Sequence, residues 1–162
     1  MFEYLKKYPL ILVTGPQRSG TTICAKMVAH DTGYMLFDET DFGVTDSERF
    51  LHFTRIHNVV IQCPHQLRIA HEISNAFVIL MKRNITDIIT SEKRVGWDKS
   101  WHMWEKSFYT YTDPRPVSEI KYEYWQKHKP QNYTEVEYES LKQHPLWFDK
   151  EHRKNFTGKQ TE

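Results

Sequence analysis

The sequence predicts an α/β protein in three layers, with a central parallel sheet of about five strands and helices on both faces. Short apolar runs rich in β-branched residues alternate with helical patterns through the first half of the chain, which is typical of parallel strands buried on both faces. The first run ends in a short loop bounded by Gly15 and Gly20, and a helical pattern follows it. A strand, a glycine loop and a helix in this order are typical of a phosphate-binding site.

The elements of the first half follow from apolar periodicity and from residues that begin or end helices. Gly33 is expected to end the first helix, because glycine readily adopts the left-handed conformation found there. A capping box at Thr45–Glu48 predicts a helix that buries Phe50, Leu51 and either Phe53 or Ile56. The expected strands are Leu10–Thr14, Tyr34–Phe37, Asn58–Cys63 and Phe77–Met81. Besides the helix that opens at the capping box, the expected helices run from Ser19 to about His30, over His65–Ile73 and from Ile85 to about Val95.

The second half is more polar, and it carries a row of aromatic residues at helical spacing, namely Trp97, Trp101, Trp104, Phe108 and Tyr111. We expect this row to pack on the sheet. The alternative is that part of it walls an acceptor pocket, because aromatic faces suit sugars and planar rings. Beyond it, a helix is expected over Val117–His128 and a fifth strand over Thr134–Tyr138, followed by a basic tail from Lys150 onward.

Length and composition favour a single domain over residues 1–162, large enough for a core of its own. The 22 basic residues nearly balance the 21 acidic ones, so there is no electrostatic case for nucleic acid as the main partner. Cys24 and Cys63 lie in apolar segments and are expected to be reduced, buried thiols. Without a signal-peptide core or a membrane-length apolar run, the sequence predicts a cytoplasmic protein with no membrane partner, and it leaves a homodimer open.

The loop between the first strand and the first helix departs from the common nucleoside triphosphate pattern at one position. The spacing from Gly15 to Gly20 fits G-x-x-x-x-G-K-[ST], but Thr21 stands where the lysine belongs. That lysine normally reaches the β- and γ-phosphates of a nucleoside triphosphate. Its absence favours a ligand whose first phosphate is held in the loop and which has no γ-phosphate to transfer.

Residues Gln17–Thr22 read Gln-Arg-Ser-Gly-Thr-Thr, so a basic residue precedes Ser-Gly-Thr-Thr. This segment resembles the 5′-phosphosulfate loop of the PAPS-dependent sulfotransferases, which use 3′-phosphoadenosine 5′-phosphosulfate in a P-loop fold, and the chain is similar to a short, divergent member. Arg83 at a strand end and Ser91 eight residues later are similar to the family's pair that binds the 3′-phosphate. Weaker similarities to family motifs lie at Val136–Leu141 and Arg153–Lys154. The resemblance implies that PAPS is bound by Gln17, Arg18, Ser19, Gly20, Thr21, Thr22, Arg83, Ser91, Arg153 and Lys154, and that no metal is needed. In many cytosolic members an adenine-stacking tryptophan stands where this chain has Ile23.

The expected reaction is transfer of the sulfuryl group from PAPS to a hydroxyl or amine of a small molecule or glycan. Charge builds on the leaving 5′-phosphate during such a transfer, so Arg18 and the backbone N–H groups of the loop are the expected catalytic contacts. A base must also take the acceptor's proton. Glu39 and His65 both follow strands whose carboxyl ends face the same crevice, and the sequence favours Glu39 slightly.

Two other functions stay open on the sequence alone. The strand that ends in Asp38 and Glu39 is also typical of small P-loop kinases, in which such an acid holds magnesium or acts as the base, so a small-molecule or nucleoside kinase is the main alternative. A non-catalytic nucleotide-binding module is the other. The missing P-loop lysine at Thr21 counts against the kinase.

Overall fold

The computed structural model of the chain describes residues 1–159 and has a five-stranded, all-parallel sheet with the order β2-β3-β1-β4-β5. Its central strand is β1, in which Leu12 pairs with Ile61 of β3 and with Val78 of β4. The bounds are β1 (Leu10–Thr14), β2 (Met35–Phe37), β3 (Val59–Gln62), β4 (Phe77–Lys82) and β5 (Tyr133–Glu137). The predicted α/β class and all five expected strands are confirmed, with ends that shift by a residue or two.

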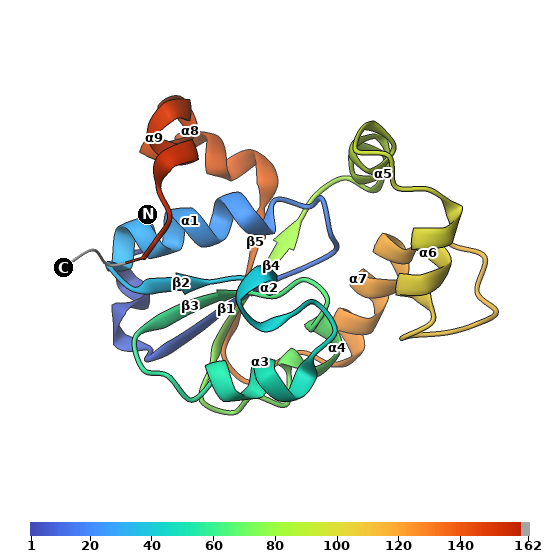
Figure 1. Cartoon of the computed structure of the whole chain (residues 1–162), viewed down its shortest axis with the longest axis horizontal. Helices are drawn as coiled ribbons and strands as arrows, with labels where there is room; N and C mark the ends of the chain where they lie inside the picture. The colour runs from blue at the N-terminus through green and yellow to red at the C-terminus, as the bar shows by residue number, and fades with distance from the viewer. Residues whose placement is uncertain (160–162) are drawn as a thin grey trace.

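The helices form layers on both faces of the sheet, as Figure 1 shows. The α-helices are α1 (Thr21–Thr32), α2 (Glu39–Phe42), α3 (Ser47–Phe53), α4 (Leu67–Ala70), α5 (Ile85–Arg94), α6 (Lys99–Lys106), α7 (Val117–Lys127), α8 (Pro145–Phe148) and α9 (Lys150–Asn155), and two 3₁₀ segments are η1 (Glu3–Lys7) and η2 (Tyr138–Gln143). Helices α1, α8 and α9 lie on one side, α3 and α4 lie on the other, and α5 and α6 project beyond the edge where the strands end (Figure 1).

The core is divided by the sheet into two apolar clusters because alternate side chains of a strand point to opposite faces. Ile11 and Val13 of β1 pack with α1, whereas Leu10 and Leu12 pack with the elements of the other face. Trp125 of α7, almost fully buried, belongs to the second cluster. Every residue of β1 is buried, which is the pattern expected for a central parallel strand.

Three helix starts differ from their sequence predictions. Helix α4 spans only Leu67–Ala70 of the predicted His65–Ile73. Helix α1 begins at Thr21 rather than Ser19, because Gly20 takes a left-handed conformation with φ of 102°. The capping box predicted at Thr45 is wrong: Asp46 is the N-cap of α3, and its carboxylate accepts a hydrogen bond from the Arg49 N–H at 2.9 Å. Of the side chains expected inside, Phe50 is buried but Leu51 and Ile56 are exposed.

The prediction that the aromatic row would pack on the sheet is wrong. Helix α6 carries only part of the row and packs against α7, and Trp104, Phe108 and Tyr111 remain exposed to solvent. The face of the sheet that this row was expected to cover is occupied by α7, α4 and α3, whose Trp125, Leu67 and Phe50 fill the second cluster. Helical periodicity identifies an amphipathic segment but does not tell which surface it covers.

Both thiols are buried and unpaired, as predicted. Burial without a compensating charge raises the pKa of Cys24 and of Cys63 well above the usual range, so both stay protonated at neutral pH. Within residues 1–159, no helix combines the length and apolar character needed to cross a membrane.

Candidate functional site

A cavity of about 520 Å³ lies at the carboxyl edge of the sheet, over the start of α1. Its walls come from the loop after β1, from the end of β4 and α5, and from the segment between η2 and α9. The lining residues are Arg18, Gly20, Thr21, Thr22, Ile23, Lys26, Arg83, Ser91, Arg94, Tyr138, Trp147, Lys150, Arg153 and Lys154. The volume is in the usual range for a small-molecule or cofactor pocket.

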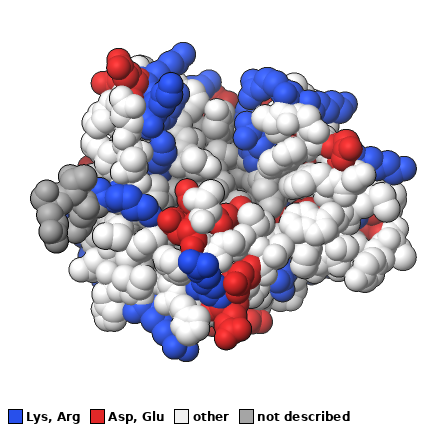
Figure 2. All heavy atoms as spheres, in the orientation of Figure 1, with Lys and Arg blue, Asp and Glu red and all other residues white. Residues whose placement is uncertain are grey.

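The cavity is strongly basic although the chain is nearly neutral. Seven of its lining residues are Lys or Arg and none is Asp or Glu. The ion pairs among residues 1–159 use other Lys and Arg side chains, so these seven cations are not neutralised by carboxylates. Figure 2 shows the result: Lys and Arg side chains stand on both sides of the hollow between α5 and the α8–α9 pair. Seven unpaired cations around a concave site predict an anionic ligand with more than one charged group.

The loop after β1 is tied to the two residues that the sequence assigned to a second phosphate. Arg18 donates from its Nε to the Ser91 hydroxyl at 3.0 Å, and Arg83 donates from its Nη1 to the Arg18 carbonyl at 2.8 Å. The Nε of Arg83 is buried and has no partner among the described residues, so one of its donors is free for a ligand. Burial lowers the pKa of Arg18, and repulsion from Arg94 and Arg83 lowers it further. A bound anion would relieve this repulsion.

An aromatic corner closes the cavity on the side of α8. The rings of Tyr138 and Trp147 meet edge to face with centroids 5.6 Å apart, and the Arg83 guanidinium stacks on Tyr138 at 4.2 Å. A Cβ on Gly20 would lie 2.6 Å from the Tyr138 ring, so only glycine permits this approach. Trp147 and Ile23 both line the cavity. Nothing in the sequence pattern indicated that Trp147 would lie here, because α8 is far from the loop along the chain.

Most residues predicted to bind the nucleotide line this cavity, but two do not. Gln17 points away from it, since its amide bonds to Lys121 and Glu105. Ser19 is fully buried, with both its N–H and its hydroxyl directed to the Pro16 carbonyl. The predicted residues that do line it are Arg18, Gly20, Thr21, Thr22, Arg83, Ser91, Arg153 and Lys154. Lys26, Arg94 and Lys150 also line it and were not predicted.

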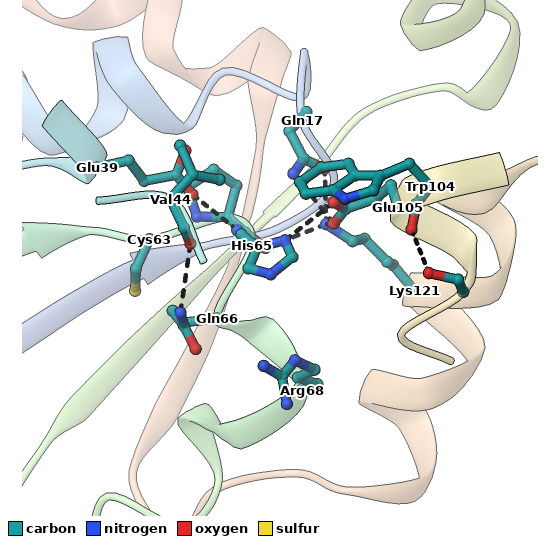
Figure 3. Close-up of polar contacts among 12 residues, drawn as sticks. Gln17, Glu39, Val44, Cys63, His65, Gln66, Arg68, Trp104, Glu105 and Lys121 are labelled. Atoms are coloured by element: carbon teal, nitrogen blue, oxygen red, sulfur yellow. Dashed lines mark hydrogen bonds and ion pairs between the residues drawn. The ribbon is translucent and has the colours of Figure 1, made fainter. Parts of the chain in front are cut away.

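The two candidate bases lie side by side next to the loop, as Figure 3 shows. The carboxylate of Glu39 accepts the His65 backbone N–H at 2.9 Å. Burial raises the pKa of Glu39 above its usual value, although the His65 N–H and the charge of Lys121 act in the opposite direction. His65 is fully buried, and its Nδ1 lies 2.9 Å from Glu105. Its Nε2 has no partner among the described residues.

A buried ion pair connects His65 to the loop after β1. Lys121 and Glu105 are both fully buried, with Nζ and Oε1 2.5 Å apart. Burial alone would raise the pKa of Glu105, but Lys121 and His65 bring it down to about 2, so Glu105 is ionised. The same carboxylate accepts from the Gln17 amide at 3.1 Å, and Lys121 also donates to the Pro64 carbonyl at 3.1 Å. Glu105 thereby fixes the positions of both the loop and the His65 ring (Figure 3).

Asp38, the possible magnesium ligand of the kinase alternative, is engaged in local structure. Its Oδ1 accepts the Thr40 N–H at 2.9 Å, and it caps α2, a helix that the sequence did not predict. The neighbouring strand β3 ends in Gln62, an amide and not a carboxylate, and this amide donates to the Thr21 hydroxyl at 3.0 Å. An amide in this place offers a cation much weaker electrostatic attraction than a carboxylate.

A second cavity of about 360 Å³ shares Thr22, Lys26 and Lys154 with the first and extends toward β2 and the C-terminal segment. Asp38 and Asp41 also line it. This cavity is therefore more mixed in charge than the first.

His30, Asp31 and His144 are close enough to resemble a metal site, but their hydrogen bonds account for them. His144 accepts the Leu146 N–H on Nδ1 at 3.1 Å, so its Nε2 carries the proton and donates to Asp31 at 2.8 Å. Asp31 also accepts the Phe2 N–H at 2.9 Å. These bonds and that of His30 outweigh burial and lower the pKa of Asp31 to about 2. The cluster joins the N-terminus and α1 to α8 and has a structural role.

The arrangement combines a basic cavity for a multiply charged ligand with a buried histidine, aligned by a carboxylate, beside the same loop. Such a pairing can hold an anionic leaving group on one side and accept a proton on the other. A scan against protein-family models and a search of curated proteins found no match to this chain.

Proposed function

We propose that this protein is a PAPS-dependent sulfotransferase that acts on a hydroxyl or amine of a small molecule or glycan. The observation that carries the proposal is the set of seven unpaired cations around one cavity without a lining carboxylate. They are divided between the two ends of the site: Arg18 belongs to the loop, whereas Arg153 and Lys154 come from α9. A nucleotide with separate 5′ and 3′ charged groups matches this division better than a single triphosphate chain.

The loop supports sulfuryl transfer over phosphoryl transfer on physical grounds. Thr21 replaces the lysine that reaches a γ-phosphate, and Asp38 is used as a helix cap. A sulfuryl group carries less charge than a γ-phosphoryl group, so its transfer depends less on a metal ion. Arg18 and the free N–H groups of the first turn of α1 can instead stabilise the charge on the leaving 5′-phosphate.

The aromatic corner supports a nucleotide as the carrier of these phosphates. Trp147 and Tyr138 present ring faces beside the basic wall, and stacking of a base on an aromatic ring contributes about 1–3 kcal/mol. In this proposal adenine lies against Trp147, and Ile23 contacts its edge. The protein is then a cytoplasmic enzyme, in keeping with its two reduced thiols.

Ligand-dependent thermal stabilisation tests this function. Adenosine 3′,5′-bisphosphate without magnesium should raise the melting temperature by several degrees at 100 times its Kd, because a ligand at that excess contributes about 2.7 kcal/mol. AMP, which lacks the 3′-phosphate, should stabilise much less at the same concentration. Stabilisation by ATP only with magnesium would support the kinase instead, and no stabilisation by either nucleotide would contradict nucleotide binding altogether.

The base in this proposal is His65, with Glu39 and Glu105 as its positioning residues. Glu105 accepts the Nδ1 proton and leaves the unpartnered Nε2 to receive the proton of the acceptor. In single-turnover experiments, His65→Asn should slow transfer about 10²-fold or more. Glu39→Gln keeps an oxygen that accepts the His65 N–H and should slow it less than tenfold.

A larger loss of rate in Glu39→Gln than in His65→Asn would instead identify Glu39 as the base. The transfer rate would then depend on pH in a characteristic way. Glu39 must be deprotonated to act as a base, and its pKa is raised. Transfer would then fall as the pH falls through that raised pKa, and Glu39→Gln would remove this dependence together with the activity. Loss in both variants with an intact melting transition would show that the pair acts as one unit.

A further inference from the structure

Three buried polar atoms near the Phe108 ring have no partner among the described residues. They are His65 Nε2, Arg68 Nε and Tyr109 Oη. Buried polar groups are almost always hydrogen-bonded in folded proteins, so these three unpartnered atoms indicate a missing ligand or bound water. Figure 3 shows Arg68 lying below the His65 ring. The His65 ring and the Arg68 guanidinium both lie against the Phe108 ring, and Tyr109 follows Phe108 in the chain.

Arg68 makes this place a site for an anion or another oxygen acceptor. Among residues 1–159 it has no carboxylate partner, and its only side-chain hydrogen bond runs from Nη2 to the Ser47 hydroxyl at 3.3 Å. Its guanidinium lies 5.4 Å from the centre of the Phe108 ring. An unpaired guanidinium with a buried N–H is poorly solvated, so it binds an oxygen anion strongly.

Two aromatic side chains lie against the His65 ring. The Trp104 ring stacks on His65 with centroids 5.5 Å apart, and Phe108 meets His65 edge to face at 4.6 Å. Trp104 is 42% exposed and Phe108 is 37% exposed, so these two rings form a cover at the surface against the buried His65. Both belong to α6 and the turn that follows it, which lies at the edge of the molecule in Figure 1.

We propose that His65, Arg68 and Tyr109 form the acceptor subsite, closed by Trp104 and Phe108, and that it takes hydroxyl compounds bearing a carboxylate or similar oxygen anion. The inference rests on the proposed sulfotransferase function. The acceptor hydroxyl donates to His65 Nε2, and the anionic oxygen accepts from Arg68 Nε and the Tyr109 hydroxyl. In the reaction, the hydroxyl oxygen forms a bond to sulfur, the bond between sulfur and the 5′-phosphate oxygen breaks, and the proton passes to His65.

The test compares matched acceptors of opposite charge by calorimetry, with adenosine 3′,5′-bisphosphate present. The probes are 3- and 4-hydroxybenzoate and the corresponding hydroxybenzylamines, which share size and hydroxyl but differ in charge. We expect the better hydroxybenzoate to bind at least tenfold more tightly than its amine. Arg68→Gln should weaken the hydroxybenzoate about tenfold and leave the amine unchanged. Phe108→Ala should speed binding by thinning the cover.

Arg55→Gln is the control, because it makes the same change at an exposed residue that lines neither cavity. Equal or better binding of the amine would overturn the proposal. No effect of Arg68→Gln, or an equal effect of Arg55→Gln, would also overturn it. Failure of all four probes to bind, while the bisphosphate still stabilises the protein, would overturn the subsite but not the sulfotransferase. If the bisphosphate does not bind but a hydroxybenzoate binds through Arg68, the subsite stands and the sulfotransferase function fails.

Discussion

Replacing Arg18 with alanine should lower the rate of sulfuryl transfer about 10³-fold with little change in melting temperature. Arginines that stabilise charge in phosphoryl-type transfers are worth 10³ or more in rate. The fold should tolerate the change for two reasons. Alanine has the same β-carbon, so backbone strain at φ of 66° is unchanged, and loss of the charge removes repulsion from Arg94 and Arg83.

The measurement is single-turnover transfer from PAPS together with a thermal melt of the same sample. Arg18→Lys is the matched control: it keeps the charge but loses the Nε donor to Ser91, so it should recover part of the rate. An Arg18→Ala variant that melts normally and transfers at the wild-type rate would remove Arg18 from the mechanism.

Arg83→Ala should weaken adenosine 3′,5′-bisphosphate about 100-fold while AMP binding changes less than threefold. Arg83 lines the cavity, and its buried Nε has no partner among the described residues. Charge-assisted hydrogen bonds to a phosphate are worth roughly 1.5–3 kcal/mol, and the larger value corresponds to about 100-fold in affinity. AMP lacks the 3′-phosphate and therefore lacks this contact. The difference between the two ligands separates recognition of the 3′-phosphate from a general loss of positive charge.

Lys82→Ala is the control for Arg83, because Lys82 is its neighbour in the chain, is only partly buried, and pairs with Glu137 outside the cavity. It removes one positive charge nearby and should affect both ligands slightly and equally. If Arg83→Ala weakened both nucleotides by the same factor, the 3′-phosphate would have to lie elsewhere, and the basic residues of α9 would be the next candidates.

The local sequence pattern was sufficient to predict the strands of the sheet. Strands such as Leu10–Thr14 are continuous apolar runs between glycine, proline or polar segments, and a run of this kind has few other stable arrangements. The residues at strand ends could also be grouped in advance, because parallel strands bring their carboxyl ends to one edge. Arg18 and Arg83 therefore meet in the cavity as the sequence indicated.

Elements whose place depends on contacts with other elements were less predictable. Helix α2 spans only Glu39–Phe42 and is held by the reciprocal hydrogen bonds of Asp38 and Asp41, which leave no periodic apolar signal. The row containing Trp104 has the expected helical spacing, but whether it covers the sheet or His65 is decided by the competing helix α7.

The sequence by itself determined the α/β class, the strand positions and the glycine loop that lines the basic cavity, because each depends on backbone preferences and apolar periodicity within a short segment. Only the tertiary structure decided that Trp147 and α9 complete the cavity, and that Glu105 and Lys121 align His65 beside the loop. These partners come from segments far apart along the chain. Their proximity follows from how helices pack on the sheet, and no local spacing encodes it.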